Sequence, residues 1–196
     1  MSKNKWGIQT KPHNICAIDA STNSLAFALY SGNNLVEIGK INFEGNDIYE
    51  KVMDAGAKVK AFFTHYGGFE AIVIEHTVFM NSPKTAADLA LVQGAILGAA
   101  GQSGTKIIGK VSPITWQNFI GNKKISKEEQ LLIRSKNPGK SISWYKSYER
   151  NLRKERTIKF INTIYNKQIT DNDVADACGI GHWTLSNWSK AIGVDK

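Results

Sequence analysis

The order in which strand-like and helix-like segments follow one another constrains this fold more than any other feature of the sequence. Three short apolar segments come first, joined by turn residues, and they predict an antiparallel meander. Two more strand-like segments follow, each after a longer stretch with helical spacing. The predicted strands span residues 14–19, 24–30, 35–43, 71–75 and 106–111. We therefore expect an α/β protein with a five-stranded mixed sheet, three strands antiparallel and two parallel, flanked by helices.

The helical segments are predicted from apolar residues that recur at intervals of three and four. They span residues 47–64, 83–100, 148–166 and 171–190. The second begins at Pro83, and proline is favoured in the first turn of a helix. This segment is rich in alanine and glycine, which permits close approach by another element. An ordinary helix lying against the sheet explains the same composition equally well.

The chain has 196 residues, of which 42% are hydrophobic and 21% are charged. These values predict a single globular domain over residues 1–196. The loop at Asn137-Pro-Gly-Lys140 marks a basic insertion within it, at about 128–150. The longest apolar region, 86–100, is interrupted by polar residues and is too short to cross a bilayer. Cys16 and Cys178 lie in apolar surroundings, which indicates reduced thiols. We expect a cytoplasmic protein without a signal peptide, located in the host-cell cytoplasm if a phage encodes it.

The positive charge is concentrated in one part of the chain. The formal net charge is +8, and residues 122–159 contain twelve basic and four acidic side chains, so this segment holds the whole excess. A localised basic field is typical of proteins that bind the phosphate backbone of nucleic acids. The alternative is a solvated helical face with a basic bias. Charge clustering favours nucleic-acid binding.

Acidic residues occur at the ends of predicted elements. Asp19 ends the first strand and Glu75 ends the fourth, whereas Asp173 and Asp176 lie three residues apart in the last helix, on one face of it. Thr170 is a candidate N-cap of that helix, and we assign Asp171 to capping rather than to a site. Acids favour the first turn of any helix, so this pair alone is weak evidence.

The four carboxylates predict a metal site if they lie close together in the fold. If the first and fourth strands are neighbours, Asp19 and Glu75 lie side by side, and the last helix can bring Asp173 and Asp176 across that edge. Four carboxylates so close raise one another's pKa unless cations neutralise them. Oxygen ligands favour Mg²⁺ or Mn²⁺. Two such ions about 4 Å apart can activate water and stabilise the leaving oxygen in phosphodiester cleavage.

These acids resemble the tetrad of the RuvC-type Holliday junction resolvases, which have the RNase H-like fold. The resemblance extends through residues 74–94, where the acid is followed by Phe79-Met80 and then by a helix that leads to Gln93-Gly94. Many RNase H-like nucleases share the tetrad, so the region around Phe79 is what indicates the resolvase branch. The resemblance covers most of the chain from Ile15 to Trp183.

The resemblance implies a metal-dependent homodimeric endonuclease that nicks two strands of like polarity at a four-way DNA junction. It implies a dimer contact through the helix at 83–100 and a base-stacking role for Phe79, which would otherwise be read as a core residue. Lys127 matches a family lysine that could neutralise charge developing on the cleaved phosphate. Trp116 stands where the family usually has a basic residue, and Lys123 and Lys124 could replace that charge. The longer stretch at 130–148 resembles phage members.

The residues expected to bind DNA combine the basic segment with this aromatic. They are Phe79, Lys123, Lys124, Lys127, Lys140, Lys146, Arg150 and Arg153. Trp144 and Tyr145 could stack on unpaired bases of a junction or could anchor the insertion to the core, and the sequence leaves both open. His76 and His182 lie near the acids in the sequence, where packing is a more frequent role than ligation.

Three other functions remain open at this point. Another RNase H-like nuclease would cut forks, flaps or RNA–DNA hybrids. A non-catalytic branched-DNA-binding protein could use the same scaffold, although the intact tetrad argues against it. Residues 19–23 also resemble the first phosphate loop of sugar kinases and actin-like ATPases, but the chain is too short for their two lobes.

Overall fold

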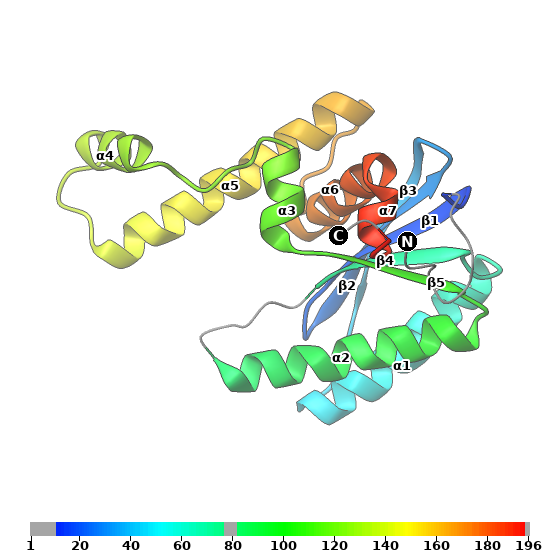
Figure 1. The fold of residues 1–196 in the computed structure, drawn as a ribbon. Coiled ribbons are helices and arrows are strands. Elements are labelled where there is room, and N and C mark those ends of the chain that lie inside the picture. The colour runs from blue at the N-terminus through cyan, green and yellow to red at the C-terminus, as the bar shows by residue number, and fades with distance from the viewer. Residues whose placement is uncertain (1–10, 77–81, 195–196) are drawn as a thin grey trace.

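A mixed five-stranded sheet lies at the centre of the computed structural model, which describes residues 11–76 and 82–194 (Figure 1). The strands are β1 (Asn14–Ala20), β2 (Ser24–Ser31), β3 (Asn34–Asn42), β4 (Ala71–Glu75) and β5 (Ile107–Val111). Their order across the sheet is β3-β2-β1-β4-β5. The first three strands are antiparallel neighbours, whereas β4 is parallel to β1 and β5 is parallel to β4. The predicted mixed sheet is confirmed.

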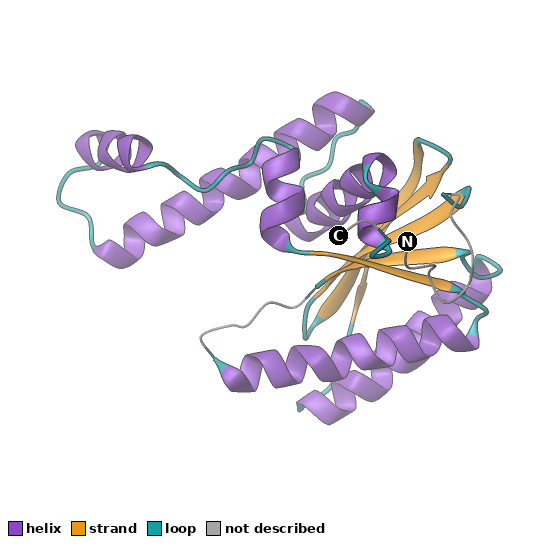
Figure 2. Cartoon of the chain, viewed as in Figure 1, coloured by secondary structure: helices purple, strands orange, loops and turns teal. Residues whose placement is uncertain are grey.

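Two long helices, α1 (Ile48–His65) and α2 (Pro83–Gln102), cover one face of the sheet (Figure 2). Alternate side chains of β1 and β4, such as Cys16, Ile18 and Ile72, point into the layer that these helices bury. The α2 helix contributes Val92 and Ile96 to this layer. Packing against the sheet, the simpler reading of α2, is therefore confirmed for its inner face.

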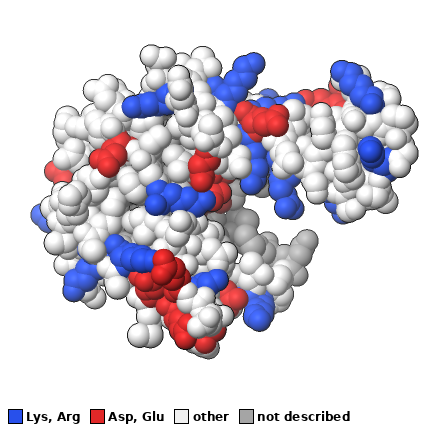
Figure 3. Space-filling view, turned by 180° about the vertical axis from the view of Figure 1, so that it is seen from behind, with Lys and Arg blue, Asp and Glu red and all other residues white. Residues whose placement is uncertain are grey.

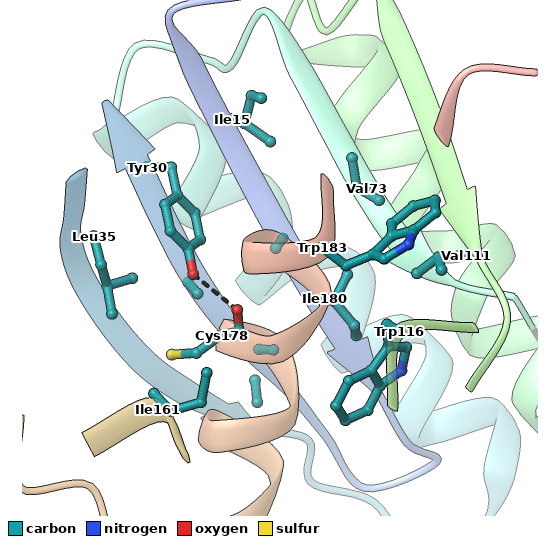
Figure 4. Close-up of a cluster of buried hydrophobic side chains, with 14 of the residues drawn as sticks. Ile15, Tyr30, Leu35, Val73, Val111, Trp116, Ile161, Cys178, Ile180 and Trp183 are labelled. Atoms are coloured by element: carbon teal, nitrogen blue, oxygen red, sulfur yellow. Dashed lines mark hydrogen bonds between the residues drawn. The ribbon is translucent and has the colours of Figure 1, made fainter. Parts of the chain in front are cut away.

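The opposite face is covered by α6 (Asn172–Ser186), together with α3 (Pro113–Phe119), α7 (Trp188–Ala191) and the second half of α5 (Ile142–Tyr165). The Tyr30 hydroxyl donates a hydrogen bond of 2.8 Å to the Cys178 carbonyl oxygen and ties β2 to α6 (Figure 4). A Cβ atom added at Gly181 would lie only 2.1 Å from the Tyr30 ring. This glycine allows α6 to approach the sheet closely.

A helical arm projects away from the sheet (Figure 1). We use this name for α4 (Lys127–Lys136), the 137–141 loop and the first half of α5. Within the arm, the Tyr145 hydroxyl donates to the Asn137 carbonyl oxygen and Arg134 lies over the Tyr145 ring. Trp144 and Tyr148 stack with their ring centroids 5.1 Å apart. Tyr145 thus anchors the arm to itself, not to the core.

The helices within the basic segment, and the short helix just before it, were predicted less well than the strands. Neither α3 nor α4 was expected, and α5 begins at Ile142 instead of near residue 148. Each of these helices starts with a serine cap, and the cap of α4 is a complete capping box between Ser126 and Glu129. These caps favour helices, but the apolar periodicity of the segment is weak, and the helices were therefore not predicted. The predicted last helix is also interrupted, at Asn187.

The turn between β2 and β3 contains Gly32 at a φ of 62°, a conformation that favours glycine. It joins the two strands so that Ser31 pairs with Asn34, and a register shift between Leu29 and Tyr30 then lets Ala26 pair with Lys40. None of the helices in the described part of the chain is long and apolar enough to cross a membrane.

Candidate active site

The sheet places Asp19 and Glu75 on the same face at the same edge. Residues of β1 pair with residues of β4 in step, up to Ile18 with Ile74, and each acid is the next residue along its strand. Ile15 and Ala17 point toward α6, as do Ala71 and Val73. Because side chains alternate, Asp19 and Glu75 also point toward α6. The expectation that these strands are neighbours is confirmed.

The two other acids come from the first turns of α6. Asp171, and not Thr170, is the N-cap, and its carboxylate accepts hydrogen bonds from the backbone N–H groups of Asp173 and Val174. The expected cap at Thr170 is wrong because the aspartate one residue later offers the stronger, charged acceptor. The capping role given to Asp171 is confirmed.

The four acids are close enough to influence one another. Burial raises the pKa of Asp19 well above its usual value, and repulsion by Glu75, Asp176 and Asp173 raises it further. Burial also raises the pKa of Glu75. For Asp176, burial and repulsion by Glu75 and Asp173 raise the pKa to about 7. The structure thus brings together the acids predicted from distant parts of the chain.

Trp116 has a role that the sequence did not reveal. Its indole Nε1–H donates a hydrogen bond of 2.6 Å to Glu75 Oε2, and its ring is fully buried. A Cβ atom at Gly179 of α6 would meet that ring at 2.6 Å, so the small residue makes room for it. Trp116, which replaces an expected phosphate-binding cation, instead orients one of the acids.

Lys40 of β3 is the second residue that sequence reasoning missed. Its ammonium lies 2.5 Å from Asp173 Oδ2 and 3.2 Å from Asp171 Oδ2. Ala26 pairs with Asp19 on one side and with Lys40 on the other, so the lysine and Asp19 lie in one row across the sheet. The register of the meander, once known, is the signal that would have placed Lys40 here.

Hard divalent cations suit the chemistry of this set. All four candidate ligands offer carboxylate oxygens. Three of them, Asp19, Glu75 and Asp176, are half-buried and have raised pKa values, because negative charge is costly there without a counter-ion. Within residues 11–76 and 82–194, no three acidic, histidine or cysteine side chains converge tightly enough to hold one ion in this arrangement. Asp173 is engaged by Lys40 and Glu75 by Trp116. Ion binding by all four acids would draw Asp173 away from Lys40.

The other predicted residues are dispersed around this centre. Lys127 is exposed at the first position of α4 and is not among the charges that shift the pKa values of Asp19, Glu75 and Asp176, whereas Lys154 acts on Asp176. Phe79 lies outside the described residues. Basic side chains gather where the arm joins the body of the protein (Figure 3). Those predicted to bind DNA there or on the arm are Lys123, Lys124, Lys140, Lys146, Arg150 and Arg153.

Neither nearby histidine joins the acids. The Nδ1 atom of His182 lies 2.8 Å from the Tyr165 hydroxyl, and its ring packs against Phe119 and Phe160. Burial lowers the pKa of His182, which favours its neutral form. His76 is exposed just beyond β4. The packing role expected for His182 agrees with these contacts.

Solved structures similar to this chain in fold include two of RuvC. A Thermus thermophilus RuvC bound to a Holliday junction substrate aligns with a TM-score of 0.64 and 15% identity over 93% of this chain and 98% of that chain. The chain has the RNase H-like fold of RuvC. A second Thermus thermophilus RuvC structure aligns with a TM-score of 0.61 and 14% identity, covering 92% of this chain and 96% of the other.

A third structure similar to this chain in fold comes from yeast. The yeast mitochondrial Holliday junction resolvase aligns with a TM-score of 0.53 and 12% identity, over 94% of this chain and 82% of that one. No protein-family model matches the sequence, and no curated protein sequence does either. The likeness to RuvC is therefore one of fold, recognised through structure at low sequence identity.

Proposed function

We propose that this protein is a metal-dependent endonuclease that resolves four-way DNA junctions by paired phosphodiester cleavage. The observation that carries the proposal is the meeting of Asp19, Glu75, Asp173 and Asp176 at one edge of a RuvC-like sheet. The basic segment supplies a surface for the DNA backbone. One nuclease domain over residues 1–196, with a basic insertion at about 128–150, fits this proposal.

In the proposed reaction, the four acids would hold Mg²⁺ or Mn²⁺, two ions per site. Bound ions of this kind activate water and stabilise the leaving oxygen of a phosphodiester. Trp116 fixes one oxygen of Glu75, so this carboxylate keeps its direction when substrate binds. Asp176 carries a pKa of about 7 and must lose its proton to act as a ligand. Lys127 is proposed to approach the cleaved phosphate from the arm.

Paired cleavage calls for two active sites, and we propose a homodimer that uses the outer face of α2. Leu91 is exposed on this helix, and small residues such as Gly94 and Gly98 have open space around them. Sedimentation of the protein with and without a junction would test this assembly. A monomer that nicks only one strand would contradict paired cleavage while leaving the nuclease activity intact.

The central experiment is cleavage of a synthetic four-way junction with Mg²⁺ or Mn²⁺, with the nicks mapped on all four strands. We expect symmetric nicks on two strands of like polarity. The Asp176→Asn variant should bind the junction and fail to cut it, because it lacks one ionised ligand. Full cleavage by this variant would contradict the role given to Asp176.

The same assay separates other nucleases of this fold. Forks, flaps and RNA–DNA hybrids should be cut more slowly than the junction. Preference for any of them would reassign the substrate without removing the catalytic centre. Binding of branched DNA with no cleavage in either metal, and no metal binding by calorimetry, would favour a non-catalytic role.

A further inference from the structure

A basic groove connects the candidate active site to the helical arm. Its volume is about 310 Å³, and it lies between α5 and the segment that links α3 to α4. One wall is formed by α3 and this link, the other by α5, and Asp176 of α6 lies in the lining. The residues of the two walls are Gln117, Asn122, Lys124 and Ile125 on one side, and Lys146, Glu149, Arg150, Arg153, Lys154 and Thr157 on the other.

The α5 wall is one continuous face of the helix. Its lining positions follow one another at intervals of three and four, from Lys146 to Thr157, as expected for residues that share a helical face. Eleven steps at 1.5 Å make this wall roughly 16 Å long. Phosphates of one strand in duplex DNA advance by about 3.4 Å along the helix axis. Because neighbouring phosphates on a strand are farther apart than this axial advance, the wall is long enough to contact more than one phosphate, though not one for each 3.4 Å of its length.

The cations of the groove are available to a ligand. It contains five basic side chains and two carboxylates, and none of the five forms an ion pair in the described part of the chain. Arg156 also lies on α5 but does not line the groove, and it is paired with Glu129. The basic residue of this region that stabilises the fold through an ion pair thus lies outside the groove, whereas those in the groove form no ion pair among the described residues.

Two buried polar atoms in the groove lack partners. The Nε of Arg153 and the Oδ1 of Asn122 are both buried without a hydrogen bond among the described residues, and Asn122 is only 4% exposed. Arg153 is held in place because one of its terminal nitrogens donates to Gln117 Oε1. An unpaired buried donor is costly unless a ligand or water accepts from it. A guanidinium fixed in this way can present its remaining terminal N–H groups to a phosphate oxygen.

The basic side chains of the groove extend from the candidate active site to the arm. Lys154 is close enough to Asp176 to lower the pKa of that carboxyl, so the cations begin beside the candidate active site. They continue through Arg150 to Lys146 on the arm. A strand with its scissile phosphate at the acids would therefore meet a positive track on one side of the cut.

We propose that this groove is a binding track for the backbone of a single DNA strand next to the scissile phosphate, with Arg153 and Lys154 as its main phosphate contacts. The proposal deepens the proposed function, on which it rests for the identity of the substrate. Arg153 and Lys154 act here as positioning residues, because they contact phosphates that are not cleaved.

The four arginines of the chain allow a direct test. Each arginine gives a separate Nε–Hε signal in ¹H–¹⁵N spectra, and single substitutions to lysine assign the signals. Pentathymidylate is titrated in EDTA, so that no divalent ion is present. We expect the signals of Arg153 and Arg150 to move, while those of Arg134, which lies over Tyr145, and Arg156 stay in place. Binding with no movement of the Arg153 signal would overturn the proposal.

A second measurement uses the salt dependence of pentathymidylate affinity. Lys154→Gln should lower the affinity and reduce the slope of log K against log salt by about 0.7, the value for one phosphate contact on a single strand. Arg153→Gln should act similarly, but Arg153 also bonds to Gln117, so Lys154 is the cleaner site. Lys159→Gln removes the same charge from an exposed α5 position outside the groove and should leave the slope nearly unchanged.

The result does not depend on catalysis. Movement of the Arg153 signal in a protein that cuts no junction would support the track and reject the proposed nuclease function. Junction cleavage with an unmoved Arg153 signal, or equal slopes for Lys154→Gln and Lys159→Gln, would reject the track and leave the nuclease function standing.

Discussion

The carboxylate edge of the sheet and the helical arm are built in opposite ways. At the sheet edge, Asp19, Glu75 and Asp176 are half-buried, and backbone register and a tightly packed helix determine their positions. On the arm, most charged side chains are exposed, and Leu131 and Ile142 are 66% and 72% exposed. The arm depends on caps, an ion pair and ring contacts.

This difference indicates which region needs exact side-chain geometry and which region tolerates substitution. A site that holds metal ions needs fixed ligands, and buried positions supply them at the cost of raised pKa values. A surface that follows a polyanion needs charge and reach more than exact geometry. We therefore expect substitutions at the sheet edge to have large, specific effects and those on the arm to have small, graded ones.

The largest effect should follow from removing the buried charge of Asp176. Its folded pKa is about 7, above the usual 3.8, so the folded protein binds more protons than the unfolded chain between these values. The free energy of unfolding without metal should then fall as the pH rises from about 4 to above 7. Asp176→Asn should remove this loss and stabilise the metal-free protein at pH 8 by a few kcal/mol. Thermal unfolding in EDTA between pH 5 and pH 8 measures this.

Asp171 provides the matched control with the opposite sign. Although its partial burial raises the pKa of this carboxyl, hydrogen bonds from Val174 and Lys40 outweigh that and lower it. The ionised Asp171 carboxylate therefore adds to the free energy of unfolding at pH values above its unfolded pKa. Asp171→Asn should remove this contribution and destabilise the protein there. Equal stabilisation by both substitutions would show that burial at the sheet edge is not what makes the charge of Asp176 destabilising.

Trp116→Phe should give the next largest effect. It keeps an aromatic ring in the core but removes the donor to Glu75, and the loss of such an orienting contact typically lowers metal affinity or activity 10–100-fold. Junction cleavage rates and Mn²⁺ affinity measure the change. Trp188→Phe is the control, because the Trp188 Nε1 is buried without a partner among the described residues. Similar losses in the two variants would assign the effect to packing alone.

A several-fold effect is expected from Lys40→Met. This substitution frees Asp173 from its ion pair and removes a competing positive charge, so Mn²⁺ should bind several-fold more tightly by calorimetry. Lys58→Met removes a lysine that pairs with Asp54 and Glu44, and it should leave Mn²⁺ affinity unchanged. Weaker Mn²⁺ binding by the Lys40 variant would mean that the lysine supports the ligands instead of competing for them.

The smallest effect concerns the arm. Ser126→Ala removes the N-cap of α4, a change that costs about 1 kcal/mol locally. Hydrogen exchange of α4 amides should accelerate, while α6 amides keep their protection. Ser135→Ala serves as the control, since that hydroxyl bonds only to the Leu132 carbonyl of its own helix. Loss of protection in α6 would show that the arm and the sheet edge fold as one unit.

Sequence reasoning succeeded where burial imposes a pattern. The five strands followed from apolar runs and the turn residues between them. The convergence followed from acids at the ends of the first and fourth strands and at the start of the last helix. It failed where the signal depends on register or on solvent-exposed contacts. Lys40 belongs to the site only because Ala26 pairs with both it and Asp19, and the contact of Trp116 with Glu75 joins residues far apart in the chain.

The turn at Gly32 has a consequence for how the site is assembled. Its left-handed backbone pairs Ser31 with Asn34, and the register shift between Leu29 and Tyr30 then pairs Ala26 with Lys40. If that hairpin closed one residue out of step, the side chains of β3 would exchange faces, and the Lys40 ammonium would emerge among the apolar residues beneath α1. Accurate closure of a small loop at one end of the sheet, together with the register shift that follows it, thereby decides whether a counter-charge reaches the acids at the other.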